Sequence, residues 1–351
     1  MTANEDSFFL KFLIPYIKYY NDLGCIVDVA SLGNEKIPYV NKKYKVDFTR
    51  KIFSFNNIKS IKQLKKIISK NKYDLIICHT PMGGMVTRMT NLKKQNKVIY
   101  VVHGFHFYKG APLLNWLLFY PIEKFLSRFT NKIVTITKDD YEYVKNRFHC
   151  EIAYTHGIGV DISKFNKVIS LKERKELKKE LGIENKKVLL FAGELNKNKN
   201  QKFLIECMNN MDKDYILLLA GKGSYYDKYK ELIKKYNLEN NVKLLGFRND
   251  IDKLLNITDI VVSSSYREGL PVNILEGLAH NIPIVASKTR GHKELIKDKK
   301  NGYLYEIDNK DDFINKVNYF KDKKIDPKIN DELLKNYDIN KVLKEMADIY
   351  D

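Results

Sequence analysis

The sequence predicts an α/β protein made of two parallel sheets with helices packed on both faces of each. Short apolar runs rich in β-branched residues alternate with segments of helical spacing, which indicates right-handed βαβ units. The runs are apolar throughout, as in strands buried on both faces. A charged stretch over 161–186 separates two sets of runs, and a length of 351 residues suits two domains.

The first set of runs predicts five strands, at Cys25–Ser31, Asp74–His79, Val98–His103, Lys132–Thr137 and Glu151–His156. The second set predicts five more, at Lys187–Gly193, Tyr215–Gly221, Val242–Gly246, Asp259–Ser264 and Ile282–Ser287. Helical spacing between the runs predicts helices, among them Ile58–Lys70, Ser224–Tyr236 and Asp252–Leu255. We therefore expect one domain over 1–165, a second over 166–335, and a C-terminal helix over 336–351 that returns to the first domain.

The beginning of the chain departs from this pattern. A doubly wound domain opens with a buried central strand, whereas here Asn4–Ser7 reads as a helix entry and Phe8–Tyr20 as the first helix. We therefore expect the opening strand to be missing, with a gap beside Cys25–Ser31 and Asp74–His79. By analogy with a standard opening, the natural gene would encode roughly six to ten more residues upstream.

Composition narrows the class of protein. Hydrophobic residues make up 44% and aromatic residues 12% of the chain, which excludes a wholly disordered protein. The net charge of +19 suggests a polyanionic partner, although lysines spread evenly among many Asn, Ile and Tyr residues also fit an AT-rich genome. The four cysteines form no CxxC pair, and no apolar run is long enough to span a membrane. We expect a cytoplasmic protein.

The stretch Arg267–Glu276 is the most informative part of the sequence. It follows a predicted strand, and Gly269 and Pro271 mark a tight loop that leads into a helix. The free N–H groups and the positive dipole end of such a helix suit an anion such as a diphosphate. Glu268 before the helix and Glu276 within it can then contact different parts of one elongated ligand.

This E-x7-E motif, here EGLPVNILE, resembles the nucleotide-sugar site of retaining glycosyltransferases of family 4. Those enzymes have the GT-B fold, in which two Rossmann-like domains face each other across a cleft. The resemblance covers essentially the whole chain, and it also includes Phe191–Glu194, Ala220–Gly223, Leu245–Arg248, His79–Gly84, His103–Gly110 and His156–Asp161. The last two of these resemble the branch that builds bacterial exopolysaccharide and capsule.

The resemblance implies a role for each matching residue. Glu276 would bind the ribose hydroxyls, Glu268 the donor-sugar hydroxyls, and Lys199 the leaving diphosphate. His103, from the acceptor-side first domain, would reach the donor sugar near the reacting carbon. The remaining nucleotide-binding residues would be Gly269, Leu270, Pro271 and Asn273 around the diphosphate, Lys197 beside them, and Phe247 and Arg248 at the base.

One residue departs from the family pattern, because Glu194 stands where the family usually has Arg. A carboxylate there repels a diphosphate, so we expect Lys197 or Arg290 to replace the lost charge, or Glu194 to face the acceptor side. Plainer roles also remain open: Lys199 as part of a solvated lysine run, His103 as a strand-end histidine, and the two glutamates as surface charges. The histidine spacing gives no metal triad.

The stretch Pro112–Phe129 also has two interpretations. It is either a buried core helix or an aromatic and basic surface that rests on an anionic membrane. The second interpretation expects Trp116 or Phe119 to be exposed.

The resemblance implies an enzyme that moves a sugar, with retention, from a nucleotide-diphosphate donor such as a UDP-sugar. The acceptor would be a lipid-linked saccharide at the inner membrane face, with no metal or other cofactor and no nucleic acid involved. One alternative is a nucleotide-sugar epimerase of the same fold. Another is a non-enzymatic protein that binds nucleic acid or an anionic surface through its charge.

Overall fold

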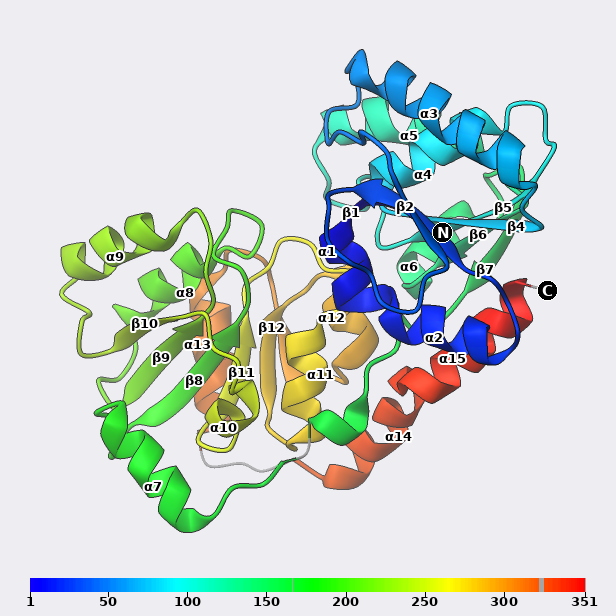
Figure 1. The fold of residues 1–351 in the computed structure, drawn as a ribbon. Coiled ribbons are helices and arrows are strands. Elements are labelled where there is room, and N and C mark those ends of the chain that lie inside the picture. Colours follow the sequence, from blue (N-terminus) through cyan, green and yellow to red (C-terminus); the bar gives the residue numbers. More distant parts are fainter. Residues whose placement is uncertain (166, 322–324, 351) are drawn as a thin grey trace. The chain divides into compact units, whose positions relative to one another are not determined.

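The computed structural model describes residues 1–165, 167–321 and 325–350, which form two compact units. The first unit comprises Met1–Gly159 together with the C-terminal segment from Ile339, and the second comprises Val160–Asp338. Each contains one parallel sheet flanked by helices (Figure 1). The division after Gly159 precedes the expected boundary, and Asn166, where the second domain was expected to begin, lies outside the described residues. Helix α15 (Ile339–Tyr350) belongs to the first unit, in agreement with the expected return.

The first sheet has seven strands in the order β3-β2-β1-β4-β5-β6-β7. Their bounds are β1 Thr2–Glu5, β2 Asp28–Leu32, β3 Lys42–Lys45, β4 Leu75–His79, β5 Lys97–Val102, β6 Lys132–Thr135 and β7 Glu151–Tyr154. The five strands predicted for this half are confirmed as β2 and β4 to β7. The short strands β1 and β3 were not predicted, because neither carries a run of apolar residues.

The expected gap in this sheet does not exist, so the prediction of a missing opening strand is wrong. Strand β1 fills the central position, where Thr2 pairs with Ala30 of β2 and with Cys78 of β4. The ammonium group of Met1 donates to the carbonyl oxygen of Asp28 at 2.7 Å. This strand reads TANE, which has no hydrophobic pattern, yet Ala3 is fully buried. The adjacent strands β2 and β4 supply hydrogen-bond partners for its backbone. A polar sequence gives no sign of this pairing.

Helices follow the strands of the first unit on both faces of the sheet. They are α1 Asp6–Phe8, the π-helical turn η1 Phe9–Leu13, α2 Ile14–Asp22, α3 Asn56–Asn71, α4 Pro81–Thr90, α5 Leu113–Ser127 and α6 Lys138–Val144. Helices α3, α4 and α5 share one apolar core on one face of the sheet. A buried ion pair joins α4 to α5, with Arg88 Nη1 and Glu123 Oε2 2.8 Å apart and the guanidinium 4.0 Å from the ring of Tyr100.

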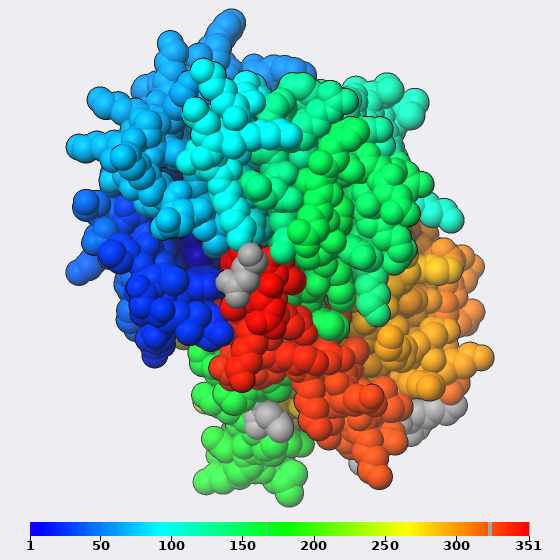
Figure 2. All heavy atoms as spheres, turned by 90° about the vertical axis from the view of Figure 1, so that its right-hand side faces the viewer, coloured from blue at the N-terminus to red at the C-terminus, as the bar shows by residue number. Residues whose placement is uncertain are grey.

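Helix α15 closes the first unit from the other end of the chain. Its Tyr350 stacks on Tyr20 of α2, with ring centroids 6.0 Å apart. Lys97 donates to the carbonyl oxygen of Tyr350 at 2.7 Å, and Glu345 Oε2 lies 3.2 Å from Nδ1 of His156. Figure 2 shows this red segment lying directly against the blue N-terminal region. The first unit is therefore built from both ends of the chain.

The second sheet has six strands in the order β10-β9-β8-β11-β12-β13, and all five predicted strands of this half are confirmed. The bounds are β8 Lys187–Ala192, β9 Tyr215–Ala220, β10 Val242–Gly246, β11 Ile260–Ser263, β12 Ile284–Ser287 and β13 Gly302–Tyr305. The helices are η2 Ile162–Lys164, α7 Leu171–Glu180, α8 Gln201–Met208, α9 Tyr226–Lys235, α10 Ile251–Leu255, α11 Val272–Ala279, α12 Arg290–Leu295, α13 Lys310–Tyr319 and α14 Pro327–Tyr337. Two apolar cores, one on each face, hold the layers together.

Candidate functional site

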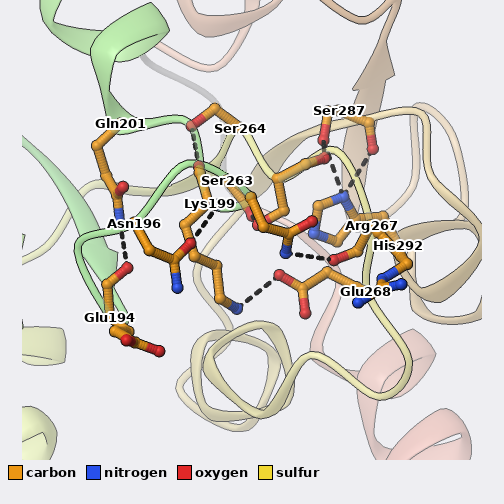
Figure 3. A network of polar contacts seen from close by, with 12 residues as sticks. Glu194, Asn196, Lys199, Gln201, Ser263, Ser264, Arg267, Glu268, Ser287 and His292 are labelled. Carbon is orange, nitrogen blue, oxygen red and sulfur yellow. Dashed lines mark hydrogen bonds and ion pairs between the residues drawn. The ribbon is translucent and has the colours of Figure 1, made fainter. Parts of the chain in front are cut away.

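The second sheet reverses its strand order between β8 and β11. From β8 the chain continues to β9 and β10 on one side, while β11 continues to β12 and β13 on the other. The loops that follow β8 and β11 therefore lead away from each other, and such switch points are where open α/β sheets bind ligands. Lys199 follows β8 and Glu268 follows β11, and the structure brings them together, with Nζ and Oε1 2.6 Å apart (Figure 3).

Backbone and side-chain hydrogen bonds fix the loop that carries Lys199. Asn196 Oδ1 accepts from the backbone N–H of Lys199 at 3.0 Å. The hydroxyl of Ser264 donates to the carbonyl oxygens of Lys199 and Asn200, each at 2.9 Å. Asn198 Nδ2 donates to the carbonyl oxygen of Arg267 at 2.9 Å. The loops after β8 and β11 are thus bonded to each other, and this positions the ion pair.

Glu268 is ionised in this environment. Burial by itself raises the pKa of a carboxyl group, but the ammonium of Lys199 and the nearby His292 outweigh it and hold the pKa of Glu268 below its ordinary value. The side chains of Lys199 and Glu268 are only 21% and 11% exposed. The site therefore offers one carboxylate and one ammonium group in a largely desolvated place, where charges interact strongly with a ligand.

His292 is a further buried residue of this site, and no role was assigned to it from the sequence. Its Nδ1 lies 2.6 Å from the carbonyl oxygen of Ser287, and because a carbonyl only accepts, Nδ1 carries the proton. Nε2 is buried and has no hydrogen-bond partner among the described residues. Ser287 in turn donates its hydroxyl to the carbonyl oxygen of Ser265 at 2.6 Å, which connects the β12 loop to the β11 loop. Burial lowers the pKa of His292 despite the attraction of Glu268.

The start of α12 packs directly on the loop of Glu268. A Cβ on Gly291 would lie 2.3 Å from the carbonyl oxygen of Gly269 and 2.9 Å from Cβ of Glu268. The variant Gly291→Ala is therefore expected to displace Glu268. If Glu268 orients the donor sugar as the resemblance implies, kcat should fall by about tenfold or more, because a misplaced group at the reacting centre is costly. Steady-state kinetics on the folded variant would measure this loss.

Gly302→Ala is a matched control for this prediction. A Cβ there would lie 2.4 Å from the carbonyl oxygen of Ile284, which is a comparable clash in the core of the sheet. Both variants are expected to lose stability, but only Gly291→Ala is expected to lose kcat per folded molecule. Equal kcat in the two variants would show that the α12 contact does not position Glu268.

The first turn of α11 lies next in the chain. Pro271 is its N-cap residue and provides no side-chain cap. The N–H of Ile274 donates to the carbonyl oxygen of Pro271 at 3.1 Å, so the N–H groups of Val272 and Asn273 are the ones with capacity for an anion. The loop residues Gly269 and Leu270 are half-buried. Nδ2 of Asn273 is buried without a hydrogen-bond partner in the described part of the chain. This unpaired donor adds to the capacity of the helix end for an acceptor ligand.

Glu276 lies on α11 and differs electrostatically from Glu268. Burial and the nearby charge of Asp252 on α10 raise the pKa of Glu276 to about 7. The two carboxyl groups of the motif are thus in opposite states: Glu268 is paired and ionised, whereas Glu276 titrates near neutral pH. Such divergence is frequent at functional sites.

Three other residues expected at the nucleotide follow strands β8 and β10 at the same edge of the sheet. Phe247 and Arg248 follow β10, which is separated from β8 by β9. Phe247 is 68% exposed, and Arg248 forms a two-point ion pair with Asp250, at 2.7 and 2.6 Å. Lys197 is exposed.

Glu194 stands where the family usually has an arginine, and Arg290 is one of the two residues expected to replace that charge. The carboxylate of Glu194 is exposed, while its carbonyl oxygen accepts from Gln201 Nε2 at 2.9 Å. Arg290 is buried, and its Nε lies 3.4 Å from the carbonyl oxygen of Glu268. Between the two candidates for a replacement charge, Arg290 is therefore the one that contacts the Glu268 loop, and Lys197 is directed to solvent.

His103 belongs to the first unit, at the end of β5. Its Nε2 lies 3.2 Å from Nδ1 of His79, at the end of β4, and the ring of Phe8 packs on both. Burial lowers the pKa of both imidazoles, to about 4 for His103. Both rings are thus neutral at the carboxyl edge of the sheet, and one of them donates its N–H to the bare nitrogen of the other. His79 lies in a quoted motif but was not singled out in the sequence analysis.

The described residues offer neither a metal-binding cluster nor a membrane-spanning helix. No group of three or more His, Cys, Asp or Glu side chains there has an arrangement that could hold a metal ion. No described helix combines the length and the apolarity needed to cross a bilayer.

Comparisons with known proteins agree on one family. Residues 173–339 match the family described as glycosyl transferases group 1, and residues 1–137 match glycosyl transferase 4-like. The chain is 37% identical to EpsD of Bacillus subtilis (strain 168), a protein named as a glycosyltransferase, over 99% of this chain and 94% of that one. It is 28% identical to an Escherichia coli UDP-Gal:alpha-D-GlcNAc-diphosphoundecaprenol alpha-1,3-galactosyltransferase, over 86% and 81% of the two chains.

The fold agrees as well. The crystal structure of Anabaena HepE in complex with UDP and glucose superposes with a TM-score of 0.79 at 21% identity, covering 96% of this chain and 94% of that one. Two parallel sheets, the E-x7-E loop and these matches lead to the same conclusion: the chain is a glycosyltransferase of family 4 with the GT-B fold.

Proposed function

We propose that this enzyme transfers a sugar from a UDP-sugar to a lipid-linked saccharide, with retention of configuration, in the synthesis of a surface polysaccharide. The observation that carries the proposal is the Lys199–Glu268 pair at the switch point, 2.6 Å apart and next to the uncapped first turn of α11. A cation and free N–H groups suit the diphosphate, and a fixed carboxylate suits sugar hydroxyls.

In the proposed reaction the bond between the anomeric carbon and the diphosphate oxygen breaks as the acceptor oxygen bonds to that carbon on the same face. The acceptor proton passes to the departing phosphate. Lys199 and the α11 N–H groups stabilise the negative charge that develops on the diphosphate. Glu268 orients the donor sugar, Glu276 accepts from the ribose hydroxyls, and Phe247 and Arg248 line the base. His103 contacts the donor sugar from the first unit.

The proposed classes of donor and acceptor are inferred from related proteins. HepE was crystallised with UDP and glucose, and the E. coli relative is named for a UDP-galactose donor and a diphosphoundecaprenol acceptor. EpsD, at 37% identity, supports the transferase class, and the exopolysaccharide branch rests on the sequence resemblance. A lipid-linked acceptor places the work of the enzyme at the cytoplasmic face of the membrane. No metal takes part in the proposed step, and nucleic acid is no partner.

The test is a screen of UDP-galactose, UDP-glucose and UDP-N-acetylglucosamine with synthetic GlcNAc-diphosphoundecaprenol, in the presence of EDTA. We expect one donor to give UDP and a disaccharide lipid whose new anomeric centre, read by NMR, matches that of the donor. An inverted centre would contradict retention, and loss of activity in EDTA would contradict the metal-free step. An epimerised UDP-sugar formed without any acceptor would identify an epimerase instead.

A further inference from the structure

Helix α5 has one apolar face buried and a second apolar face exposed. Its inner side packs Trp116, Phe119 and Tyr120 against the core of the first unit, so neither Trp116 nor Phe119 is exposed as the membrane interpretation had expected. The outer side carries four exposed hydrophobic side chains at helical spacing: Leu113 at 73%, Leu114 at 71%, Leu117 at 67% and Phe125 at 50%. An exposed apolar stripe of this kind marks an interaction site.

The stripe does not result from loose packing of α5. The buried ion pair between Glu123 and Arg88 of α4 fixes the helix from inside, and the amide of Asn115 bonds to the carbonyl oxygen of His106 at 3.1 Å. Glu123 is the one acidic residue of α5, and its charge is neutralised by Arg88. The outer face therefore presents hydrophobic groups with exposed Lys109 before it and exposed Arg128 after it, and no carboxylate.

Helix α3 lies in the same helical layer and has the same character. Helices α3 and α5 both pack on the core beside α4 (Figure 1). Phe53 and Phe55, immediately before α3, are 83% and 91% exposed. The helix itself contains five lysines and no acidic residue, namely Lys59, Lys62, Lys65, Lys66 and Lys70. Both helices follow parallel strands, so their N-terminal ends lie at the carboxyl edge of the sheet.

We infer that the outer face of α3 and α5 docks on an anionic lipid bilayer. Leucine and phenylalanine side chains enter the boundary between head groups and acyl chains, while the lysines contact the anionic head groups. The charge complementarity favours a membrane over a second copy of this chain, because the same lysine-rich face on two copies would repel. This inference rests on the proposed function only in that a lipid-linked acceptor requires an enzyme at the bilayer.

The test is co-sedimentation of the full chain with vesicles of phosphatidylcholine alone and with a third phosphatidylglycerol. We expect binding to the anionic vesicles, and the triple variant L113S/L114S/L117S is expected to lower the partition coefficient by about tenfold or more. The matched control L23S/I26S changes side chains that are 59% and 80% exposed, in the connection between α2 and β2 at the opposite edge of the same sheet. This control is expected to bind as the unchanged protein does.

The charge contribution is tested separately. The variant K62Q/K66Q is expected to bind anionic vesicles about tenfold less tightly and to show a shallower dependence on added salt, because two of the five α3 lysines lose their charge. The leucine variant is expected to keep the full salt dependence of the unchanged protein. Equal vesicle binding by the leucine variant and its control would overturn the inference, and so would a wild-type dimer in light scattering that the leucine variant alone abolishes.

Binding of UDP, measured by calorimetry on the same proteins, separates this inference from the proposed function. Unchanged UDP binding with no vesicle binding would overturn the membrane surface and leave the transferase proposal intact. Vesicle binding that needs the leucines would support the surface even if no UDP-sugar were turned over.

Discussion

Lys199→Ala is expected to lower kcat by about a hundredfold to a thousandfold, the range seen when one preorganised donor to a developing negative charge is removed. Lys199 has its Nζ 2.6 Å from Glu268 and is fixed by bonds from Asn196 and Ser264, so another side chain cannot replace it easily. The measurement is the steady-state rate of UDP release, with KM determined for the donor. A larger effect on kcat than on KM would indicate charge compensation in the transition state.

Two further variants separate catalysis from stability. Lys202→Ala removes a neighbouring lysine that is exposed and pairs with Glu206 at 3.4 Å, so its kcat should change less than about twofold. Lys199→Ala also leaves Glu268 without its cation, at a cost of about 1–3 kcal/mol. The double variant Lys199→Ala/Glu268→Gln should recover that stability without recovering activity. Recovery of activity in the double variant would show that Lys199 serves only to neutralise Glu268.

The affinity for the nucleotide is expected to rise with pH through neutrality, because Glu276 must ionise to accept from both ribose hydroxyls. Burial and Asp252 raise its pKa to about 7. Uridine is the probe of choice, since it lacks phosphates that titrate in the same range. Calorimetry between pH 6 and pH 8 should give an affinity that rises towards a plateau above neutrality. A flat profile would remove Glu276 from the ribose site.

Glu276→Gln provides the control. At pH 8 it should weaken uridine binding by about tenfold to a hundredfold, the value of a charged hydrogen bond, and it should remove the pH dependence. Asp252→Asn removes the like charge beside Glu276, lowers the pKa of Glu276 and should move the midpoint of the profile to lower pH. Neither shift is expected from a carboxylate that acts only in packing.

The ionisation of Glu276 strengthens nucleotide binding but lowers the stability of the folded state. The folded state holds the Glu276 proton more tightly than the unfolded chain does, because the pKa is raised from an ordinary value of 4.5 to about 7. The resulting stability is fully present below about pH 4.5 and is lost as the pH rises through 7, on the order of 3 kcal/mol in total. Glu276→Gln is therefore expected to raise the melting temperature at pH 8 while it weakens the nucleotide site.

The hydrophobic pattern of the sequence was sufficient to predict most strands of the two sheets. It failed for strands that form only because of their tertiary contacts. Strands such as Tyr215–Ala220 consist of buried hydrophobic residues and are recognisable from the sequence alone. Strand β1 is not, because its four residues are mostly polar and gain their partners from β2 and β4. Strand β3 has the sequence KKYK and can be recognised as a strand only from its pairing with β2 in the structure.

The site divides in the same way. The Gly-Pro loop between a buried strand and a helix identified Glu268 and Glu276, and the family resemblance identified Lys199. Sequence could not show that Lys199 and Glu268 touch, or that their neighbours give the two glutamates opposite protonation behaviour, because both depend on residues far apart in the chain. His292 had one usable signal: it follows β12 shortly after the strand ends, at the edge where Glu268 follows β11.

The route of the chain has a consequence for biosynthesis. Val160 pairs with Asp338, and its N–H donates to the carbonyl oxygen of Tyr337 at 2.9 Å, so the second unit begins and ends at adjacent points. The ribosome therefore delivers a second unit that can fold as a closed module while the first still lacks α15. Until that helix is made, Tyr20 and Lys97 remain without Tyr350. The nascent first unit thus offers chaperones an incomplete surface for the whole time that the second unit is being translated, and a circular permutant that starts at Ile339 would remove this delay.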